Sequence, residues 1–376
     1  MPDTSTRLAD LSPEQRQRLL DRLASRATQT TAAKREPAVA AWPSSLSADE
    51  NVVAEFTQPG ILDSLRFTRV PRKAPGRGQL EIEVHAAALN FRDVMIALGM
   101  YPTSSGAAAQ MGSDCSGTVV AVGPEVTEWR VGDEVVALSN GLCRYSLAVD
   151  AAVARKPAAM THESAATIPT VFLTAYYGLR HLAHLAANER VLIHSAAGGV
   201  GLAAIQIARS LGADIIATAG TEEKRQFVRS LGITHVFDSR SLAFAADVLR
   251  VTERRGVDVV LNSLAGEAIA KGVGLLRPLG RFVELGKRDI YQNFTLGLSP
   301  FRKALSFHAL ELGMVVGQRP SLFRSMFADV LGAFAAGTFT PLPATTFGIG
   351  DLKSAIEHMS QGTHRGKVAV RVKGDA

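Results

Sequence analysis

The residues best suited to binding a ligand lie in one glycine-rich turn, within the stretch Val191 to Leu211, VLIHSAAGGVGLAAIQIARSL. Val191–His194 form a short apolar run typical of a buried strand, and from Val200 the apolar residues recur at the spacing of one helix face. A turn between a strand and a helix leaves backbone N–H groups at the helix N-terminus, where they bind a pyrophosphate. The stretch therefore predicts dinucleotide binding.

The turn departs from the G-x-G-x-x-G pattern at its first position. Ala196 takes the place of the first glycine, Gly198 the second and Gly201 the third. A plain tight turn without a ligand is the alternative, but the strand before it and the helix after it favour a binding site. The predicted phosphate-binding residues are Ala197, Gly198, Gly199, Val200 and Gly201.

The residues about 20 positions further on distinguish the two nicotinamide cofactors, since an NAD site usually has Asp or Glu there for the ribose 2′-hydroxyl. Here the strand 214–219 ends in Gly220-Thr221 without an acid. Lys224 and Arg225 follow after Glu222 and Glu223. Two cations close to a strand tip that carries no acid fit a 2′-phosphate, with Lys224 the stronger candidate, so we predict NADPH. The alternative is that both are solvated charges on a helix capped by Thr221.

Composition limits the class of protein. The 376 residues, 47% hydrophobic and 20% charged, suffice for two domains or for one large domain with an insertion. No apolar run approaches the ~20 residues of a membrane span. The polar N-terminus shows no signal peptide, and two cysteines cannot form a disulfide framework, so we predict a cytoplasmic location. The excess of 41 Lys and Arg over 35 Asp and Glu, without interleaved aromatics, favours an anionic cofactor or an acidic carrier protein over nucleic acid.

Changes of pattern divide the chain into four predicted segments. Residues 1–47 are predicted to form a linker with a short amphipathic helix that starts at Ser12-Pro13. Residues 48–164 carry alternating and glycine-punctuated strands of an all-β module. Residues 165–305 alternate helices with strands, which predicts a doubly wound parallel sheet. Residues 306–376 hold one or two helices and a last strand, which most simply rejoins the β module.

Five motifs occur in the chain, namely Leu89–Asp93, His194–Gly201, Val260–Leu264, Glu284–Asp289 and His364–Val368. Together they resemble the medium-chain dehydrogenase/reductase superfamily, and more narrowly the enoyl reductase domain of a modular polyketide synthase or animal-type fatty acid synthase. The likeness covers about residues 50–372. It implies an α/β fold, with a Rossmann doubly wound parallel sheet and a GroES-like β-barrel substrate domain split in sequence. The opening Leu11–Gln15 is similar to linkers between synthase domains, which implies an excised domain or a stand-alone homologue.

The resemblance implies NADPH-dependent reduction of trans-2-enoyl thioesters to saturated acyl thioesters, with hydride added at Cβ and a proton at Cα. The substrates implied are polyketide or fatty acyl chains on an acyl carrier protein, with other synthase domains as possible partners. No metal is implied, because two cysteines cannot supply the zinc sites of related alcohol dehydrogenases. Two alternatives stay open: a stand-alone NADPH-dependent quinone or enone reductase, and a catalytically silent NADPH-binding protein.

Three residues are the catalytic candidates. Lys287 follows a strand that ends at Leu285-Gly286, which puts it at the carboxyl edge of the sheet, where ligands bind. The family's lysine here is considered an acid or oxyanion donor. Glu311 takes the place of the family's acidic partner, often aspartate, and its extra methylene puts pairing with Lys287 in doubt. Tyr101 lies in a loop where tyrosine is associated with a (2S) α-methyl product. Each has a simpler alternative: Lys287 as a surface lysine, Glu311 as a solvated carboxylate on a helix, and Tyr101 as a packing aromatic.

The resemblance also places four further residues around the cofactor. Asn90 and Thr174 are expected near the nicotinamide, Asn262 near the ribose and Arg240 by the 2′-phosphate. Each has a simpler alternative: Asn90 and Thr174 as helix caps, Asn262 as part of a strand-end turn, and Arg240 as a surface charge.

Gly286 and Lys367 complete the predicted cofactor-binding set. Lys367 is expected to act through its backbone, with a side chain that could be solvated. His194 is more simply a strand histidine with its hydrogen bonds satisfied than a catalyst. Cys115, among small residues on a predicted strand, fits a packed core thiol.

Overall fold

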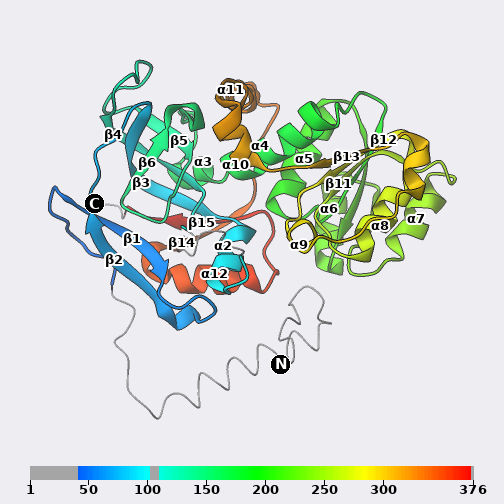
Figure 1. Cartoon of the computed structure of the whole chain (residues 1–376), viewed down its shortest axis with the longest axis horizontal. Coiled ribbons are helices and arrows are strands. Elements are labelled where there is room, and N and C mark those ends of the chain that lie inside the picture. Colours follow the sequence, from blue (N-terminus) through cyan, green and yellow to red (C-terminus); the bar gives the residue numbers. More distant parts are fainter. Residues whose placement is uncertain (1–40, 102–109, 374–376) are drawn as a thin grey trace, which may run out of the picture. The chain divides into compact units, whose positions relative to one another are not determined.

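The structure is a computed structural model that describes residues 41–101 and 110–373. The helix predicted near the N-terminus lies outside these residues, and residues 41–47 form neither helix nor strand. Within the described ranges, no helix has the length and apolarity needed to cross a membrane. The described chain contains a two-stranded hairpin and two larger sheets (Figure 1).

The alternating and glycine-punctuated segments form the first large sheet. Its strands are β3 (Gln79–Leu89), β4 (Asp114–Val122), β5 (Glu134–Leu138), β6 (Tyr145–Val149), β7 (Val153–Arg155), β14 (Ala344–Gly348) and β15 (Lys367–Arg371). They run in the order β14-β15-β3-β4-β5-β7, with β6 also paired to β3. The red β15 lies antiparallel to the blue β3 in Figure 1, so the last strand of the chain completes the first module. The predicted split β module is thus confirmed.

Shorter elements surround this sheet. The hairpin of β1 (Glu50–Phe56) and β2 (Leu65–Pro71) is antiparallel. The helices of this part are α2 (Phe91–Ala97), α3 (His162–Ala166) and α12 (Leu352–Ser360), with 3₁₀ turns η2 (Leu62–Ser64), η3 (Asp150–Ala152) and η6 (Ile349–Asp351). Only small side chains fit where β3 meets α3, since Ala86, Ala88 and Ala166 form one buried cluster.

The second large sheet is parallel. Its strands are β8 (Arg190–Ile193), β9 (Asp214–Ala219), β10 (His235–Asp238), β11 (Val257–Asn262), β12 (Leu276–Glu284) and β13 (Ser306–Ala309). The order β10-β9-β8-β11-β12-β13 is that of a Rossmann fold, because the first strand lies in the middle and the order reverses between β8 and β11. The predicted doubly wound sheet is therefore confirmed, and ligands are expected at the carboxyl ends of the strands beside this reversal.

Helices cover both faces of the parallel sheet. The helices between residues 169 and 335 are α4 (Pro169–Tyr176), extended by the π-helical η4 (Tyr177–Leu182), then α5 (Gly199–Ser210), α6 (Glu222–Ser230), α7 (Phe244–Val251), α8 (Glu267–Gly274), α9 (Arg288–Tyr291), η5 (Ser299–Lys303), α10 (Leu312–Gln318) and α11 (Pro320–Ala335). Val191 and Ile193 pack with α4 and α5 in one core, whereas Leu192 packs with α7 and α8 in the other. The continuous apolar run in β8 is required because both of its faces are buried.

The parallel sheet extends past residue 305, where the sequence predicts that the nucleotide-binding segment ends. β13 pairs with β12 through Ala309. This edge strand is largely exposed, and its residues Ser306, Phe307, His308 and Ala309 show no apolar run. The sequence pattern of a buried strand is therefore missing where the sheet ends. The four segment boundaries stay predictions.

Candidate active site

The glycine-rich turn accommodates alanine at its first position because another residue adopts the left-handed conformation. Ser195 has φ +52°, whereas Ala196 donates its N–H to Thr218 O at 2.8 Å. Helix α5 begins at Gly199, and its first helical bond runs from Leu202 N–H to Gly198 O. The N–H groups of residues 199–201 thus have no partner within the helix, as an anion site needs.

Two glycines let this turn pack tightly. A Cβ at Gly201 would lie 2.5 Å from Ala196 Cα and 2.6 Å from Ser195 O, so helix and turn touch through backbone. A Cβ at Gly199 would lie 2.8 Å from a Val171 methyl and 3.0 Å from Lys367 Cδ. By contrast, a Cβ at Gly198 would meet only Ser195 O, at 3.3 Å.

The end of the chain closes over this turn. Gly366 donates its N–H to Ala197 O at 3.0 Å, and Gly198 forms a parallel bridge with Gly366. Gly366 has φ +69°, and a Cβ there would lie 2.0 Å from Pro343 O. The segment that carries Lys367 therefore contacts Ala197 and Gly198 through its backbone, and its contribution to cofactor binding stays a prediction.

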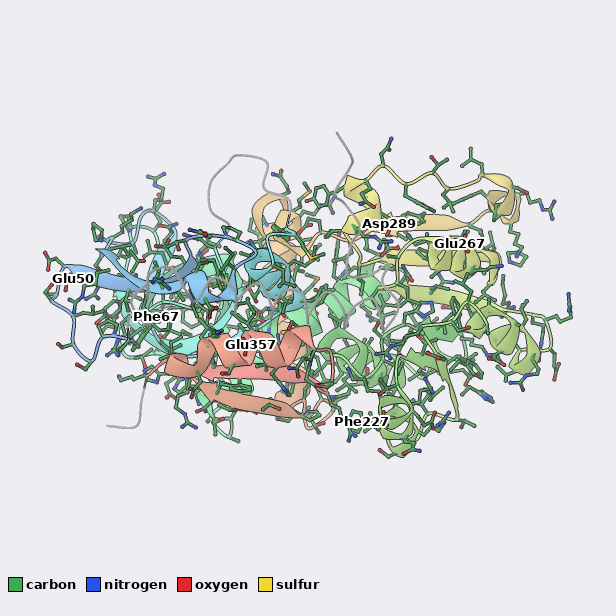
Figure 2. All side chains as sticks on the ribbon, turned by 90° about the horizontal axis from the view of Figure 1, so that it is seen from below. Glu50, Phe67, Phe227, Glu267, Asp289 and Glu357 are labelled. Carbon is green, nitrogen blue, oxygen red and sulfur yellow. The ribbon has the colours of Figure 1, made fainter. Side chains whose placement is uncertain are left out.

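A cluster of cations lies beyond the end of β9. Lys224 donates to Gly362 O at 2.7 Å, and its pKa is lowered by burial first and then by the charges of Arg240 and Arg365. Arg240 is exposed, and its Nε lies 3.1 Å from where a Cβ on Gly220 would be. Arg365 lies over the ring of Phe227, at 5.2 Å from the ring centre. Figure 2 labels Phe227. Within the described residues, none of these three cations is paired with a carboxylate.

Arg225, the weaker candidate, is engaged elsewhere. Its guanidinium lies 2.8 Å from a Glu222 oxygen and 3.4 Å from an Asp238 oxygen. Arg365 was not among the predicted phosphate ligands, although it stands in the matched motif His364–Val368. Its position beside Lys224 depends on the return of the chain, which no local pattern reveals.

Asn262 and Glu284 join the loops that follow β11 and β12. The two residues are register partners, and Asn262 Nδ2 donates to Glu284 Oε2 at 2.6 Å and to Leu264 O at 2.7 Å. Glu284 Oε1 accepts the N–H of Gly286 at 2.6 Å. Burial raises the pKa of the Glu284 carboxyl to about 7. The Asn262 side chain thus stabilises the turn at the end of β11, which is the simpler of the two roles considered for it in the sequence.

A second carboxylate, that of Asp289, stabilises the segment that follows β12. Asp289 accepts the N–H of Gly266 at 3.1 Å, just before α8 begins at Glu267 (Figure 2). Lys287 therefore lies on a segment anchored on both sides, by Glu284 and by Asp289. Neither carboxylate was singled out in the sequence, where both appear as ordinary members of the Glu284–Asp289 motif.

Lys287 and Glu311 form an ion pair, contrary to the doubt raised by the extra methylene. Lys287 Nζ lies 2.6 Å from Glu311 Oε2 and also donates to Leu310 O. Because β13 is parallel to β12, the residues after both strands emerge at one edge of the sheet. Glu311 caps α10, where Oε1 accepts the N–H of Gly313 at 3.4 Å. The pair is partly exposed, with 27% and 43% of the two side chains accessible.

Tyr101 is half-buried and held by α2. Its N–H donates to Met95 O at 3.1 Å, and the guanidinium of Arg92 lies over its ring at 4.8 Å from the ring centre. Residues 102–109 lie outside the described part, so Tyr101 is the last described residue of this loop. The guanidinium of Arg92 therefore covers one face of the Tyr101 ring.

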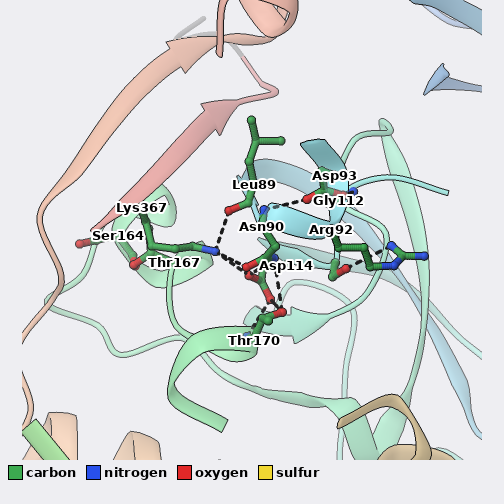
Figure 3. A network of polar contacts seen from close by, with 11 residues as sticks. Leu89, Asn90, Arg92, Asp93, Gly112, Asp114, Ser164, Thr167, Thr170 and Lys367 are labelled. Atoms are coloured by element: carbon green, nitrogen blue, oxygen red, sulfur yellow. Dashed lines mark hydrogen bonds and ion pairs between the residues drawn. The ribbon is translucent and has the colours of Figure 1, made fainter. Parts of the chain in front are cut away.

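Asn90 lies in a buried polar network (Figure 3). Its Oδ1 accepts from Lys367 Nζ at 2.7 Å, and its Nδ2 donates to Asp114 Oδ2 at 2.8 Å. The Lys367 side chain is 2% exposed, so the expectation that it could be solvated is wrong. Asp114 and Thr170, which bonds the second Asp114 oxygen, were missed. In the sequence Asp114 stands beside Cys115, and nothing local marks it as buried.

Three further residues considered in the sequence lie in the interior of the protein: Thr174, His194 and Cys115. Thr174 lies within α4 and is 9% exposed, so it is no helix cap. His194 Nδ1 lies 2.9 Å from Thr218 Oγ1, but its buried Nε2 has no hydrogen-bond partner among the described residues, so the expectation that its hydrogen bonds are satisfied holds for one ring nitrogen only. Burial lowers the pKa of His194 to about 3, which fits a core histidine. Cys115 is fully buried, and burial raises the pKa of its thiol.

Comparisons with known proteins agree with this geometry. Residues 76–160 match the alcohol dehydrogenase GroES-like domain, and residues 199–332 match the zinc-binding dehydrogenase family. The phthioceranic/hydroxyphthioceranic acid synthase of Mycobacterium tuberculosis is 45% identical over 85% of this chain. This chain spans 15% of that synthase. The solved CurK enoyl reductase is 39% identical, with a TM-score of 0.78, over 86% of this chain and 99% of that one. The JamJ enoyl reductase is 32% identical, with a TM-score of 0.80 over the same shares.

The chain belongs to the polyketide synthase enoyl reductases. These are oxidoreductases of the medium-chain dehydrogenase/reductase superfamily, and the resemblance seen in the sequence is confirmed. The superfamily fold implies a nicotinamide cofactor. The residues fit one, because the N–H groups of residues 199–201 have no partner within helix α5 and cations lie beyond β9.

The zinc in one matched family's name has no counterpart in the donor set of this enoyl reductase. Among the described residues, no three or more His, Cys, Asp or Glu side chains are grouped to hold a metal ion. The cysteines Cys115 and Cys143 are both buried and free.

Proposed function

We propose that this enoyl reductase uses NADPH to reduce trans-2-enoyl thioesters, carried on an acyl carrier protein, to saturated acyl thioesters. The cofactor choice rests on one observation: Lys224, Arg240 and Arg365 lie close to one another beyond the end of β9. The acids that follow Thr221 are Glu222, which pairs with Arg225 and Arg229, and the exposed Glu223. Three cations attract a 2′-phosphate, whereas the 2′-hydroxyl of NADH prefers a carboxylate. The N–H groups of residues 199–201 would bind the pyrophosphate.

The bound cofactor supplies hydride to Cβ of the alkene. The protein must then stabilise the negative charge that develops on the thioester oxygen. Lys287 suits this role, because its ammonium lies at the carboxyl edge of the sheet and is partly exposed. Glu311 restrains the Lys287 side chain, which limits the geometries the ammonium can adopt. Tyr101 is the proposed donor that protonates Cα or orients the enolate.

The proposed protein partners are inferred from the length of the related synthases. The curated relatives are several times longer than this chain, which spans 15% and 16% of two of them. We propose that other synthase domains and an acyl carrier protein cooperate with this reductase. The two free thiols, Cys115 and Cys143, suit the reducing cytoplasm that we propose as its location.

The decisive assay follows NADPH oxidation with a trans-2-enoyl pantetheine thioester, beside NADH and a benzoquinone. We expect turnover of the thioester with a strong preference for NADPH. Quinone turnover without thioester turnover would replace this proposal with the stand-alone quinone reductase. Binding of NADPH without oxidation by either substrate, or by an enoyl chain on a carrier protein, would favour a silent binding protein.

A further inference from the structure

The Lys367 ammonium occupies a cage of oxygen atoms in the interior. It donates to Leu89 O at 2.8 Å and Asn90 Oδ1 at 2.7 Å, and it lies 3.1 Å from Asp114 Oδ2 (Figure 3). Both charged side chains are almost fully buried, with 2% and 0% exposed. A buried pair of this kind is rarely kept for stability alone, because desolvation of the two charges offsets their attraction.

The side-chain polar atoms of Asn90 and Asp114 around this ammonium all form hydrogen bonds. Asp114 Oδ1 accepts both the N–H and the hydroxyl of Thr170, at 2.8 and 2.6 Å. Asn90 Nδ2 donates to Asp114, so Lys367 and Asp114 together fix which way the Asn90 amide faces. The backbone N–H of Asn90 donates to Asp93, which also accepts from Gly112. Asn90 is therefore locked in one orientation at the start of α2.

The stem of the same lysine lies against the cofactor turn. Its Cδ and Cγ would lie 3.0 and 3.4 Å from a Cβ at Gly199, the first residue of α5. The preceding residue, Gly366, donates to Ala197 O in that turn. One side chain thus spans from the predicted pyrophosphate site to Asn90.

The far end of this connection leads to Tyr101. Asn90 caps α2, Met95 of that helix accepts the Tyr101 N–H, and Arg92 of that helix covers the Tyr101 ring. A shift of Asn90 would therefore be transmitted to the tyrosine through a short and continuous set of contacts.

We propose that Lys367 is a positioning residue whose ammonium acts as a built-in cation, coupling the cofactor turn to Asn90 and the start of α2. The cation holds both parts in one alignment, so that cofactor binding and the placement of Tyr101 depend on one side chain. The effect on kcat rests on the proposed function. The effect on NADPH affinity requires only that the protein binds the cofactor.

The first test separates charge from packing. Lys367→Met keeps most of the stem but leaves Asp114 unpaired, whereas the double variant Lys367→Met/Asp114→Asn removes both charges and should fold more stably than the single variant. We expect the double variant to bind NADPH about 10-fold more weakly, judged by fluorescence titration, within the range usual for coupled sites. Its kcat should also fall. Lys353→Met, at a surface lysine paired with Asp63, is the matched control and should change neither quantity.

A double variant with the wild-type Kd and kcat would overturn the proposal, since the pair would then serve stability only. The second test uses Lys367→Ala with n-propylammonium, which replaces the three carbons and the ammonium removed. We expect this amine, and not the neutral propanol, to restore NADPH affinity. Failure of both probes to restore affinity in a folded variant would contradict the cation's role. If the wild-type enzyme reduces no enoyl thioester, the proposed function fails, but the NADPH titrations still decide the inference.

Discussion

Lys287 Nζ lies 2.6 Å from Glu311 Oε2, although the two residues belong to different loops of the parallel sheet. We expect Lys287→Ala to lower kcat about 10²–10³-fold, the usual cost of removing one donor to a developing oxyanion. Glu311→Gln should cost less, because it removes only the restraint on the lysine. Steady-state kinetics with an enoyl pantetheine thioester measures both. Lys271→Ala, at an exposed lysine of α8, should not change kcat. An unchanged kcat in Lys287→Ala would exclude this lysine as the donor.

The cofactor preference should depend on Lys224 and not on its neighbour. We expect Lys224→Ala to reduce the ratio of kcat/KM for NADPH to that for NADH at least about 10-fold, because a hydrogen bond to a charged group contributes about 1.5–3 kcal/mol and about 1.4 kcal/mol corresponds to a factor of ten. Arg225→Ala is the matched control on the same helix turn, since Arg225 is already paired with Glu222. Equal losses in the two variants would show that the effect is only one of net charge.

Two glycines of the turn should respond very differently to alanine. A methyl at Gly201 would meet the backbone of Ala196 at 2.5 Å, which no rotamer can relieve. Gly198 has an extended backbone at φ −84°, and a methyl there would meet only Ser195 O at 3.3 Å. We expect Gly201→Ala to lower the thermal midpoint and abolish NADPH binding, whereas Gly198→Ala folds with little loss of stability. Comparable thermal midpoints for the two variants would refute this packing argument.

Glu284 should make the stability of the fold depend on pH. Burial raises its pKa from 4.5 to about 7, so its contribution is complete below pH 4.5 and is lost as the pH rises to about 7. The full change is roughly 3 kcal/mol, at 1.36 kcal/mol per pKa unit. Urea unfolding between pH 5 and pH 8 should show this decline, and Glu284→Gln should flatten it. Glu267→Gln, at an exposed residue of the preceding helix α8, should leave the decline intact. An equally steep decline in Glu284→Gln would assign it to other groups.

Tyr101 should control the protonation step. With an α-methyl enoyl thioester, we expect Tyr101→Phe to lower kcat by about 10²-fold or to erode the configuration of the product, because the phenol proton is lost and the ring is kept. Chiral analysis of the saturated product measures the second effect. Tyr291→Phe is the control, because Tyr291 is 59% exposed. A fully active and stereospecific Tyr101→Phe enzyme would mean that the ring only packs under Arg92.

The sequence by itself determined the elements and the cofactor class. Period-2 alternation around Glu81–Ala86 and the apolar run at Val191–Ile193 depend on which faces are buried, and burial is written locally in residue spacing. The glycine turn is equally local, because backbone contact at Gly201 excludes any side chain. The motifs added the family, which the comparisons confirmed.

Only the tertiary structure decided which distant residues meet. Lys287 pairs with Glu311 because β13 joins β12, and β13 is an exposed edge strand without an apolar pattern. Lys367 lies buried against Asp114 because the last strand returns beside β3. A charged residue in the sequence looks the same whether it is solvated or enclosed, since its surroundings come from segments far away along the chain. Burial and pairing of charges are therefore properties of the fold and not of the local sequence.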